Sequence, residues 1–149
     1  MPIIQFTESD KLAAVVADAG FYQAVVKEMD VKASGSGKST NIWTSFEITQ
    51  EGKFKGKEIK CCFNSEVNNA SMLGGTQFRP QSDVLVLAAA IQNVPLDAVS
   101  LNINTDDLLL KGFDLQVGVD VAEGMPVNNT GNFVPFGKAT SAEAQKVAF

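Results

Sequence analysis

The side chains from Asn41 to Gln50 alternate between two different faces, and this pattern restricts the fold more than any other feature of the chain. One face carries Ile42, Thr44, Phe46 and Ile48, and the other carries Trp43, Ser45, Glu47 and Thr49. A period of two is that of a β-strand with one face on a core. Similar alternation in Lys57–Asn64 and in Phe113–Glu123 predicts two more strands. The chain is therefore expected to build a sheet.

The remaining segments complete a mainly β pattern. We expect a short helix in Thr7–Ala19, strands in Phe21–Lys32 and Val127–Pro135, a buried helix in Val84–Ile91 ended by Asn93, and a helical turn in Thr105–Gly112 capped by Thr105; loops are expected at 33–40 and at Glu66–Gln77. Five strands with one main helix between the third and fourth is the order of the OB fold, a Greek-key barrel that binds oligonucleotides across its second and third strands. With 149 residues, one such domain at 1–136 and a tail at 137–149 are predicted.

Several classes of chemistry are excluded by what the sequence lacks. It contains no His, which removes Ser-His and Cys-His nucleophiles. Cys61 and Cys62 are adjacent, so they supply no disulfide framework and at most half of a zinc site. Asp106 and Asp107 suit the start of a helical turn, and we find no carboxylate pair at catalytic spacing. The sequence predicts a non-enzyme without metal or cofactor.

The N-terminal residues lack the basic and apolar regions of a secretory signal, and no window reaches the ~18 apolar residues of a membrane span. Two unframed cysteines also fit a reducing compartment. We therefore expect a cytoplasmic location.

Lysine is concentrated in one part of an acidic chain. The formal net charge is −5. Residues 27–60 nevertheless have a net charge of +2, and their densest run is Gly52–Lys60. These lysines fall on the predicted second and third strands, where an OB fold holds its ligand. Lysine also solvates hairpins and protects edge strands, so a structural reading stays open.

The run from Gly35 to Thr40 resembles the end of a phosphate-binding loop but fails in context. That motif requires a glycine at the position of Lys32 and a helix after the loop, whereas a strand is predicted here. We interpret the segment as the loop between the first two strands, with Lys38 near its tip.

Aromatic residues among the lysines indicate how a single strand would bind. Trp43 lies opposite the core face of its strand, where a base could stack on it; the alternative is that it covers a small core formed by the loop 66–77. Phe54 lies between Lys53 and Lys55 in a hairpin tip and is expected to be exposed. Tyr22 is expected on the core side.

Several of these segments together resemble a family of phage-encoded proteins. The resemblance covers roughly residues 20–136 and rests on Gly20–Val26, the Ser-Gly-Ser-Gly-Lys loop, Ile42–Ile48, Phe54–Ile59, Asp107–Phe113, Gly124 with Asn128, and Phe133–Pro135. It implies an OB-fold protein that binds single-stranded DNA in phage replication and recombination, in the cytoplasm of a bacterial host. It supports Trp43 and the lysines of the 53–60 hairpin as strand contacts.

The leading hypothesis is therefore sequence-tolerant binding of single-stranded DNA. The candidate contacts are Lys38, Trp43, Lys53, Phe54, Lys55, Lys57 and Lys60. Neutralising about three to five phosphates would give a slope of roughly −2 to −4 for log K against log salt. The alternative is a phage structural or protein–protein interaction module without nucleic acid. Partner proteins of replication or recombination, and a homo-oligomer, are compatible with either hypothesis.

Overall fold

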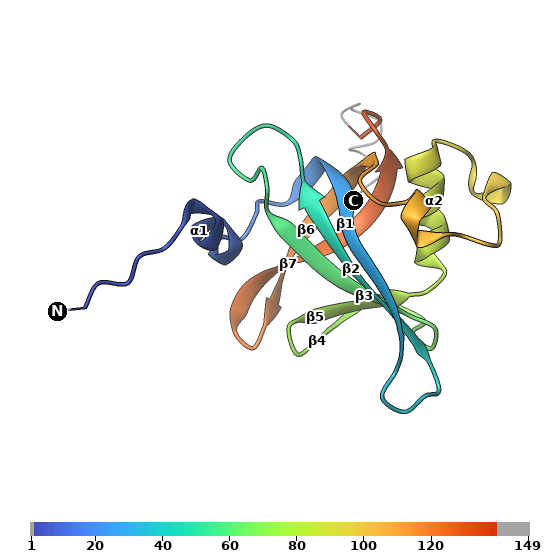
Figure 1. Ribbon diagram of the computed structural model, residues 1–149, viewed down its shortest axis with the longest axis horizontal. Coiled ribbons are helices and arrows are strands. Elements are labelled where there is room, and N and C mark those ends of the chain that lie inside the picture. The colour runs from blue at the N-terminus through green and yellow to red at the C-terminus, as the bar shows by residue number, and fades with distance from the viewer. Residues whose placement is uncertain (1, 140–149) are drawn as a thin grey trace.

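The computed structural model describes residues 2–139, in which seven strands form one mixed, curled sheet (Figure 1). The strand order is β4-β5-β3-β2-β1-β6-β7. All neighbouring strands pair antiparallel except β3 and β5, which are parallel. The bounds are β1 Gly20–Ala33, β2 Thr40–Ile48, β3 Glu58–Asn64, β4 Ser71–Leu73, β5 Thr76–Pro80, β6 Gly112–Ala122 and β7 Met125–Pro135.

The mainly β class is confirmed, but the expected count of five strands is wrong. The predicted loop at Glu66–Gln77 contains β4 and runs into β5. Both strands are short, and β5 turns the polar side chains of Gln77 and Arg79 inward while Phe78 is half-buried on the other face. A search for inward apolar residues therefore misses this strand, because its polar side chains face inward and its phenylalanine faces outward.

The core lies on the inner face of the curled sheet. Its centre is a group of phenylalanine rings, Phe46, Phe63, Phe113 and Phe133, whose contacting centroids are 5.6 to 6.3 Å apart. Each ring comes from a different strand, so the group joins β2, β3, β6 and β7. The alternation in β2 is confirmed, because Ile42, Phe46 and Ile48 are all buried.

The helix α2 (Asp83–Gln92) packs against β6 and β7. Its buried side chains include Leu87 and three consecutive alanines, as its apolar sequence predicted. Asn93 ends it in the left-handed conformation, with a φ of 55°. Two 3₁₀ turns follow, η1 at Leu96–Ala98 and η2 at Thr105–Asp107. The cap of η2 is Asn104 rather than the predicted Thr105, because the Asn104 side chain accepts the backbone N–H of Asp106.

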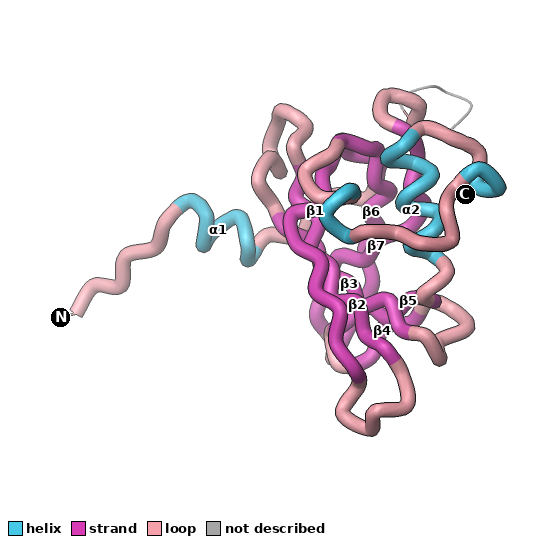
Figure 2. The backbone as a smooth tube through the Cα atoms, turned by 45° about the vertical axis from the view of Figure 1, so that its right-hand side comes forward, coloured by secondary structure: helices cyan, strands magenta, loops and turns pink. Residues whose placement is uncertain are grey.

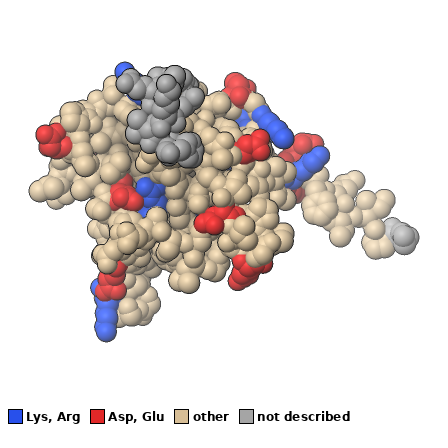
Figure 3. Space-filling model, turned by 180° about the vertical axis from the view of Figure 1, so that it is seen from behind, with Lys and Arg blue, Asp and Glu red and all other residues tan. Residues whose placement is uncertain are grey.

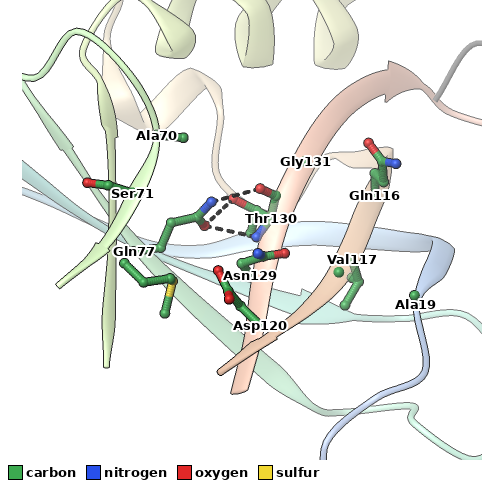
Figure 4. Close-up of a pocket in the computed structure, with 12 residues that line it drawn as sticks. Ala19, Ala70, Ser71, Gln77, Gln116, Val117, Asp120, Asn129, Thr130 and Gly131 are labelled. Atoms are coloured by element: carbon green, nitrogen blue, oxygen red, sulfur yellow. Dashed lines mark hydrogen bonds between the residues drawn. The ribbon is translucent and has the colours of Figure 1, made fainter. Parts of the chain in front are cut away.

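Side chains join β5 to β7 across the inner face of the curled sheet, where no backbone ladder joins the two strands. Gln77 exchanges hydrogen bonds with the backbone of Thr130 at 2.8 Å in both directions (Figure 4). Arg79 donates to the Thr130 hydroxyl at 3.0 Å and to the Gly131 carbonyl at 2.8 Å. The Arg79 guanidinium also lies 4.4 Å from the centroid of the Phe133 ring. We call these contacts the seam.

The N-terminal helix α1 (Glu8–Ala14) is shorter than predicted and projects from the curled sheet (Figures 1 and 2). Thr7 and Asp10 form a capping box at its start, with both hydrogen bonds at 3.0 Å. The helix ends at Ala14, because Val15 is extended. No helix among the described residues is long and apolar enough to cross a membrane.

The predicted tail at 137–149 falls mostly on residues 140–149, which lie outside the described residues. Its first part turns back onto the sheet. The backbone N–H of Ala139 donates to the Asp114 carboxylate at 3.0 Å, and Ala139 is buried.

Candidate nucleic-acid interface

Trp43 lies on the outer face of the sheet, as the alternation in β2 predicted. Its register partners are Asp30 on β1 and Cys62 on β3, and Cys62 pairs in turn with Phe78 on β5. The indole is 41% exposed and meets the Phe78 ring edge-on at 6.2 Å. Cys62 is fully buried on the same face. Trp43 and Phe78 therefore form an aromatic pair that leaves part of the indole open to solvent.

Trp43 is partly packed and partly exposed. The residue packs against Phe78 on β5, one position beyond the loop 66–77 that was expected to form a small second core, and it also keeps an exposed surface. Its contact with Phe78 restricts the indole, because an edge-to-face pair has a preferred geometry. A ring held in this way can stack on a flat ligand with little further loss of side-chain freedom.

A hollow of about 350 Å³ lies beside the indole. Its lining includes Glu28, Asp30, Lys32, Trp43, Ser45 and Lys60. The charges in it have both signs, and the Lys32 amino group lies 3.2 Å from the Asp30 carboxylate. The hollow is thus an aromatic surface between two lysines and two acids. We call this region, together with Phe78, the Trp43 face.

One edge of the Trp43 face is held by an ion pair that joins β1 to β3. The Lys27 amino group lies 3.0 Å from Glu58, and the Ser45 hydroxyl donates to the same carboxylate at 2.9 Å. The hydrogen bonds from Lys27 and Ser45 lower the pKa of Glu58, and the pKa of Lys27 is raised in return. Lys27 therefore serves the sheet and is not a free cation.

The β2–β3 loop differs from its prediction. Phe54 was expected to be exposed, and it is only 6% exposed and belongs to the core. Its ring meets Tyr22 edge-on at 6.1 Å, and Tyr22 is half-buried against the core as expected. The loop folds back because Gly56, at a φ of 90°, donates its N–H to the Ile48 carbonyl at 2.7 Å. No base could stack on Phe54 without unpacking this contact.

Lys57 is also buried, with 7% of its surface exposed. Its amino group donates to the carbonyls of Leu12 and Ala13, both at 3.3 Å. These carbonyls belong to the C-terminal turn of α1, where the helix dipole favours a cation. Burial lowers the pKa of Lys57. The residue anchors α1 and is not available for a phosphate.

The other predicted lysines are spread over two loops and one strand. Lys55 pairs with Glu51, and the Lys53 amino group lies 5.3 Å from the centroid of the Phe54 ring. Lys38 lies in the β1–β2 loop, at the opposite end of β2 from Lys53 (Figure 1). At strand rise, nine residues of β2 separate the two loops by about 30 Å. Of the seven candidates, Trp43 and Lys60 line one hollow, and Lys57 and Lys60 line another of about 280 Å³.

Sequence reasoning missed Phe78, Lys32 and the two acids of the hollow. The alternation Gln77-Phe78-Arg79 was a signal for Phe78, but it has the opposite polarity from an ordinary half-buried strand. Glu28 and Asp30 reach the hollow because β1 shifts register between Val26 and Glu28. A bulge of this kind is not visible in hydrophobic periodicity.

Other parts of the described chain offer less to an anion. A hollow of about 330 Å³ beside the seam is lined by Asp120, Asn129 and Gln116 among others, and by no Lys or Arg (Figure 4). The rear face of the molecule shows interspersed acids and bases rather than a continuous basic patch (Figure 3). Among residues 2–139, no group of three or more acids and cysteines could hold a metal ion.

Burial favours the protonated thiol form of both cysteines. Burial raises the pKa of Cys61 to about 12 and also raises the pKa of Cys62. A thiol is a poor nucleophile and metal ligand in this state. Cys61 belongs to the core and Cys62 to the outer face, so the two side chains point apart.

No protein-family model matches the chain, and no curated protein matches it. The resemblance to phage single-stranded-DNA-binding proteins therefore stays a prediction.

Proposed function

We propose that the chain binds single-stranded DNA across the Trp43 face, without catalysis and with little sequence preference. The observation that carries this proposal is the part-exposed indole of Trp43, oriented by Phe78 and placed beside Lys60. Aromatic rings next to cations are the basis of sequence-tolerant binding, because every base offers a π-face and every nucleotide a phosphate.

The topology supports the same proposal. Without the short strands β4 and β5, the order β1-β2-β3-α2-β6-β7 is that of an OB fold, and β1 pairs with both β2 and β6. We infer an OB-like barrel in which β5 has been inserted between β3 and the last strand. The Trp43 face then corresponds to the second and third strands, where such barrels bind oligonucleotides.

In this mode a base stacks on Trp43 while flanking phosphates meet Lys60 and Lys32. Lys32 must exchange Asp30 for a phosphate, and the acids of the hollow repel the strand. Binding is therefore weaker than the five candidate lysines would suggest. Duplex DNA is disfavoured, because its bases are already stacked on one another. The phage replication or recombination setting follows from the sequence resemblance alone.

An interaction module without nucleic acid is the second candidate. The observation in its favour is that large apolar side chains are exposed at two places away from the Trp43 face, Ile3 and Phe6 ahead of α1 and Leu101 ahead of η2. The net charge of −5 also fits protein partners better than DNA.

Fluorescence titration separates the two functions. Trp43 is the only Trp in the chain, so its emission reports on this face alone. We expect a labelled oligothymidylate to quench the emission and to shift in a gel, and a duplex of the same length to do neither. Unchanged emission together with no shift of the single strand at low salt would exclude DNA binding at this face and leave the interaction module.

A further inference from the structure

Pro2–Val16, which we call the N-terminal arm, leaves apolar side chains uncovered. None of the residues of α1 is buried. Ahead of it, Ile3, Ile4 and Phe6 are all strongly exposed, Phe6 to 74%. The arm runs away from the barrel in both ribbon views (Figures 1 and 2). Three large apolar side chains so close together are unusual on a surface that contacts only water.

The base of the arm is held by specific contacts. Lys57 binds the last carbonyls of α1, and Ala17 exchanges two backbone hydrogen bonds with the Asn128 side chain, at 2.8 and 2.9 Å. The capping box fixes the start of the helix. The direction of the arm is therefore set by these anchors, and they point its apolar tip away from its own barrel.

The opposite side of the molecule carries an apolar groove of about 550 Å³. It lies between α2, the segment before η2 and the far half of the β1–β2 hairpin. Its apolar lining includes Met29, Val31, Ile42, Leu85, Leu101 and Ile103. Leu101 is 90% exposed. None of the residues that line the groove is charged.

We propose that the arm tip of one copy, Ile3 to Phe6, packs into this groove of a second copy. Residues 2–6 carry no charged side chain, so two acidic chains can meet at these surfaces without bringing like charges together. The groove has room for large side chains such as Ile4 and Phe6. While Lys57 and Asn128 hold its base, the arm points away from the groove of its own copy, because α1 lies on the opposite side of the molecule from α2, which lines the groove (Figure 1).

The contact joins two different surfaces, so each copy keeps a free arm or a free groove. Such a heterologous contact does not close on itself unless the rotation between copies forms a ring. Copies would then add head to tail. One part of the inference rests on the proposed function: the line of copies coats a single strand of DNA, and the contact between arm and groove makes DNA binding cooperative.

The experiment measures self-association without DNA, by sedimentation of the full chain over a range of concentrations. Two variants each remove one side of the contact: Ile4→Ser with Phe6→Ser alters the arm, and Leu101→Ser alters the groove. Leu110→Ser is the matched control, because Leu110 is exposed and lies in neither surface. All the substituted side chains are exposed, so the variants are expected to fold normally.

We expect the wild type and Leu110→Ser to form assemblies larger than a dimer, and each of the other two variants to associate at least about tenfold more weakly. The decisive sample is a mixture of the arm variant and the groove variant. Only one intact arm–groove pair exists in that mixture, so it should give dimers and nothing larger. Monomers at every concentration of the wild type, or equal association of all four proteins, would overturn the proposal.

The outcome is independent of DNA binding. Trp43→Ala should leave sedimentation unchanged, and the arm variant should bind an oligothymidylate long enough for only one copy as well as the wild type does. If the wild type self-associates but does not bind DNA, the proposed function alone is contradicted. If the wild type stays monomeric but binds the short strand, the arm contact alone is contradicted.

Discussion

The β2–β3 loop and the outer face of β2 contain similar residues but use them differently. Both place an aromatic ring near lysines, Phe54 in the loop and Trp43 on the strand. Phe54 is in the core and Trp43 is part-exposed. Likewise Lys57 in the loop is buried against α1, whereas Lys60 on β3 is exposed. The difference shows that lysine density locates a surface only where a regular strand fixes which side chains point outward.

Phe54→Ala tests the difference between the loop and the strand most directly. We expect a loss of about 3 to 5 kcal/mol in the free energy of unfolding, because a buried ring is replaced by a cavity. DNA affinity of the folded fraction should not change. Denaturant titration measures the first quantity, and a gel shift measures the second. Leu110→Ala is the control, since Leu110 is exposed and its loss should cost less than about 0.5 kcal/mol.

Trp43→Ala should show the reverse pattern. We expect binding of an oligothymidylate to weaken by about 1 to 3 kcal/mol, the range for one stacked base. The free energy of unfolding should fall by less than about 2 kcal/mol, because part of the ring is already in water. Trp43→Phe should retain most of the affinity. A stability loss as large as that of Phe54→Ala, with unchanged binding, would make Trp43 a core residue only.

The two lysines provide a matched pair. Lys57→Met should lower stability by about 1 to 2 kcal/mol, because two helix carbonyls lose a charged donor. It should leave the salt dependence of DNA binding unchanged. Lys60→Met should do the opposite and make the slope of log K against log salt shallower by about 0.7, one phosphate contact.

The structure also reduces the salt dependence expected for the wild type. With Lys57 buried and Lys55 paired, Lys32 and Lys60 of the Trp43 face neutralise about two phosphates, which gives a slope of roughly −1.4. A measured slope near −4 would mean that lysines outside the Trp43 face, such as Lys53, also contact the strand.

The smallest effect is expected at Glu58, where the loop ends and the strand face begins. Lys27 and Ser45 lower the pKa of its carboxyl, so its contribution to stability is present above the unfolded pKa and is lost as the pH falls through the folded pKa. Glu58→Gln should remove this part of the pH dependence. Because the pair is about two-fifths exposed, we expect a change below about 1 kcal/mol, measured by denaturation at neutral pH and near pH 4.

Sequence reasoning succeeded in β2, where every second side chain faces an apolar core. It placed Ile42, Phe46 and Ile48 inside and Trp43 outside, because a strand fixes that alternation. It failed for Phe54 and Lys57, since a loop has no period and their partners Tyr22 and Leu12 are distant in sequence. It also missed β5, whose inward Gln77 and Arg79 are satisfied by residues of β7 about 50 positions away.

The spacing of the lysines was misleading for a further reason. Lys38 and Lys53 are only one strand apart in the sequence, but a strand carries the chain from one end of the sheet to the other. Two loops that flank one strand are therefore close in sequence but lie at opposite ends of the sheet. Only side chains from neighbouring strands at the same register, such as Trp43 and Cys62, come together.

The seam determines where the curled sheet can open most easily. Everywhere else in the described sheet, neighbouring strands are joined by backbone ladders, but Gln77 and Arg79 alone connect β5 to β7 by side-chain hydrogen bonds. Closing the 53-residue interval between Gln77 and Thr130 orders a long stretch of chain for a few bonds. We therefore expect the seam to separate in brief local fluctuations while β1 and β2 stay paired. The Thr130 amide would then exchange its hydrogen with water much faster than the amides of the central ladder. The curled sheet would open locally between β5 and β7 while the rest of the fold stays intact.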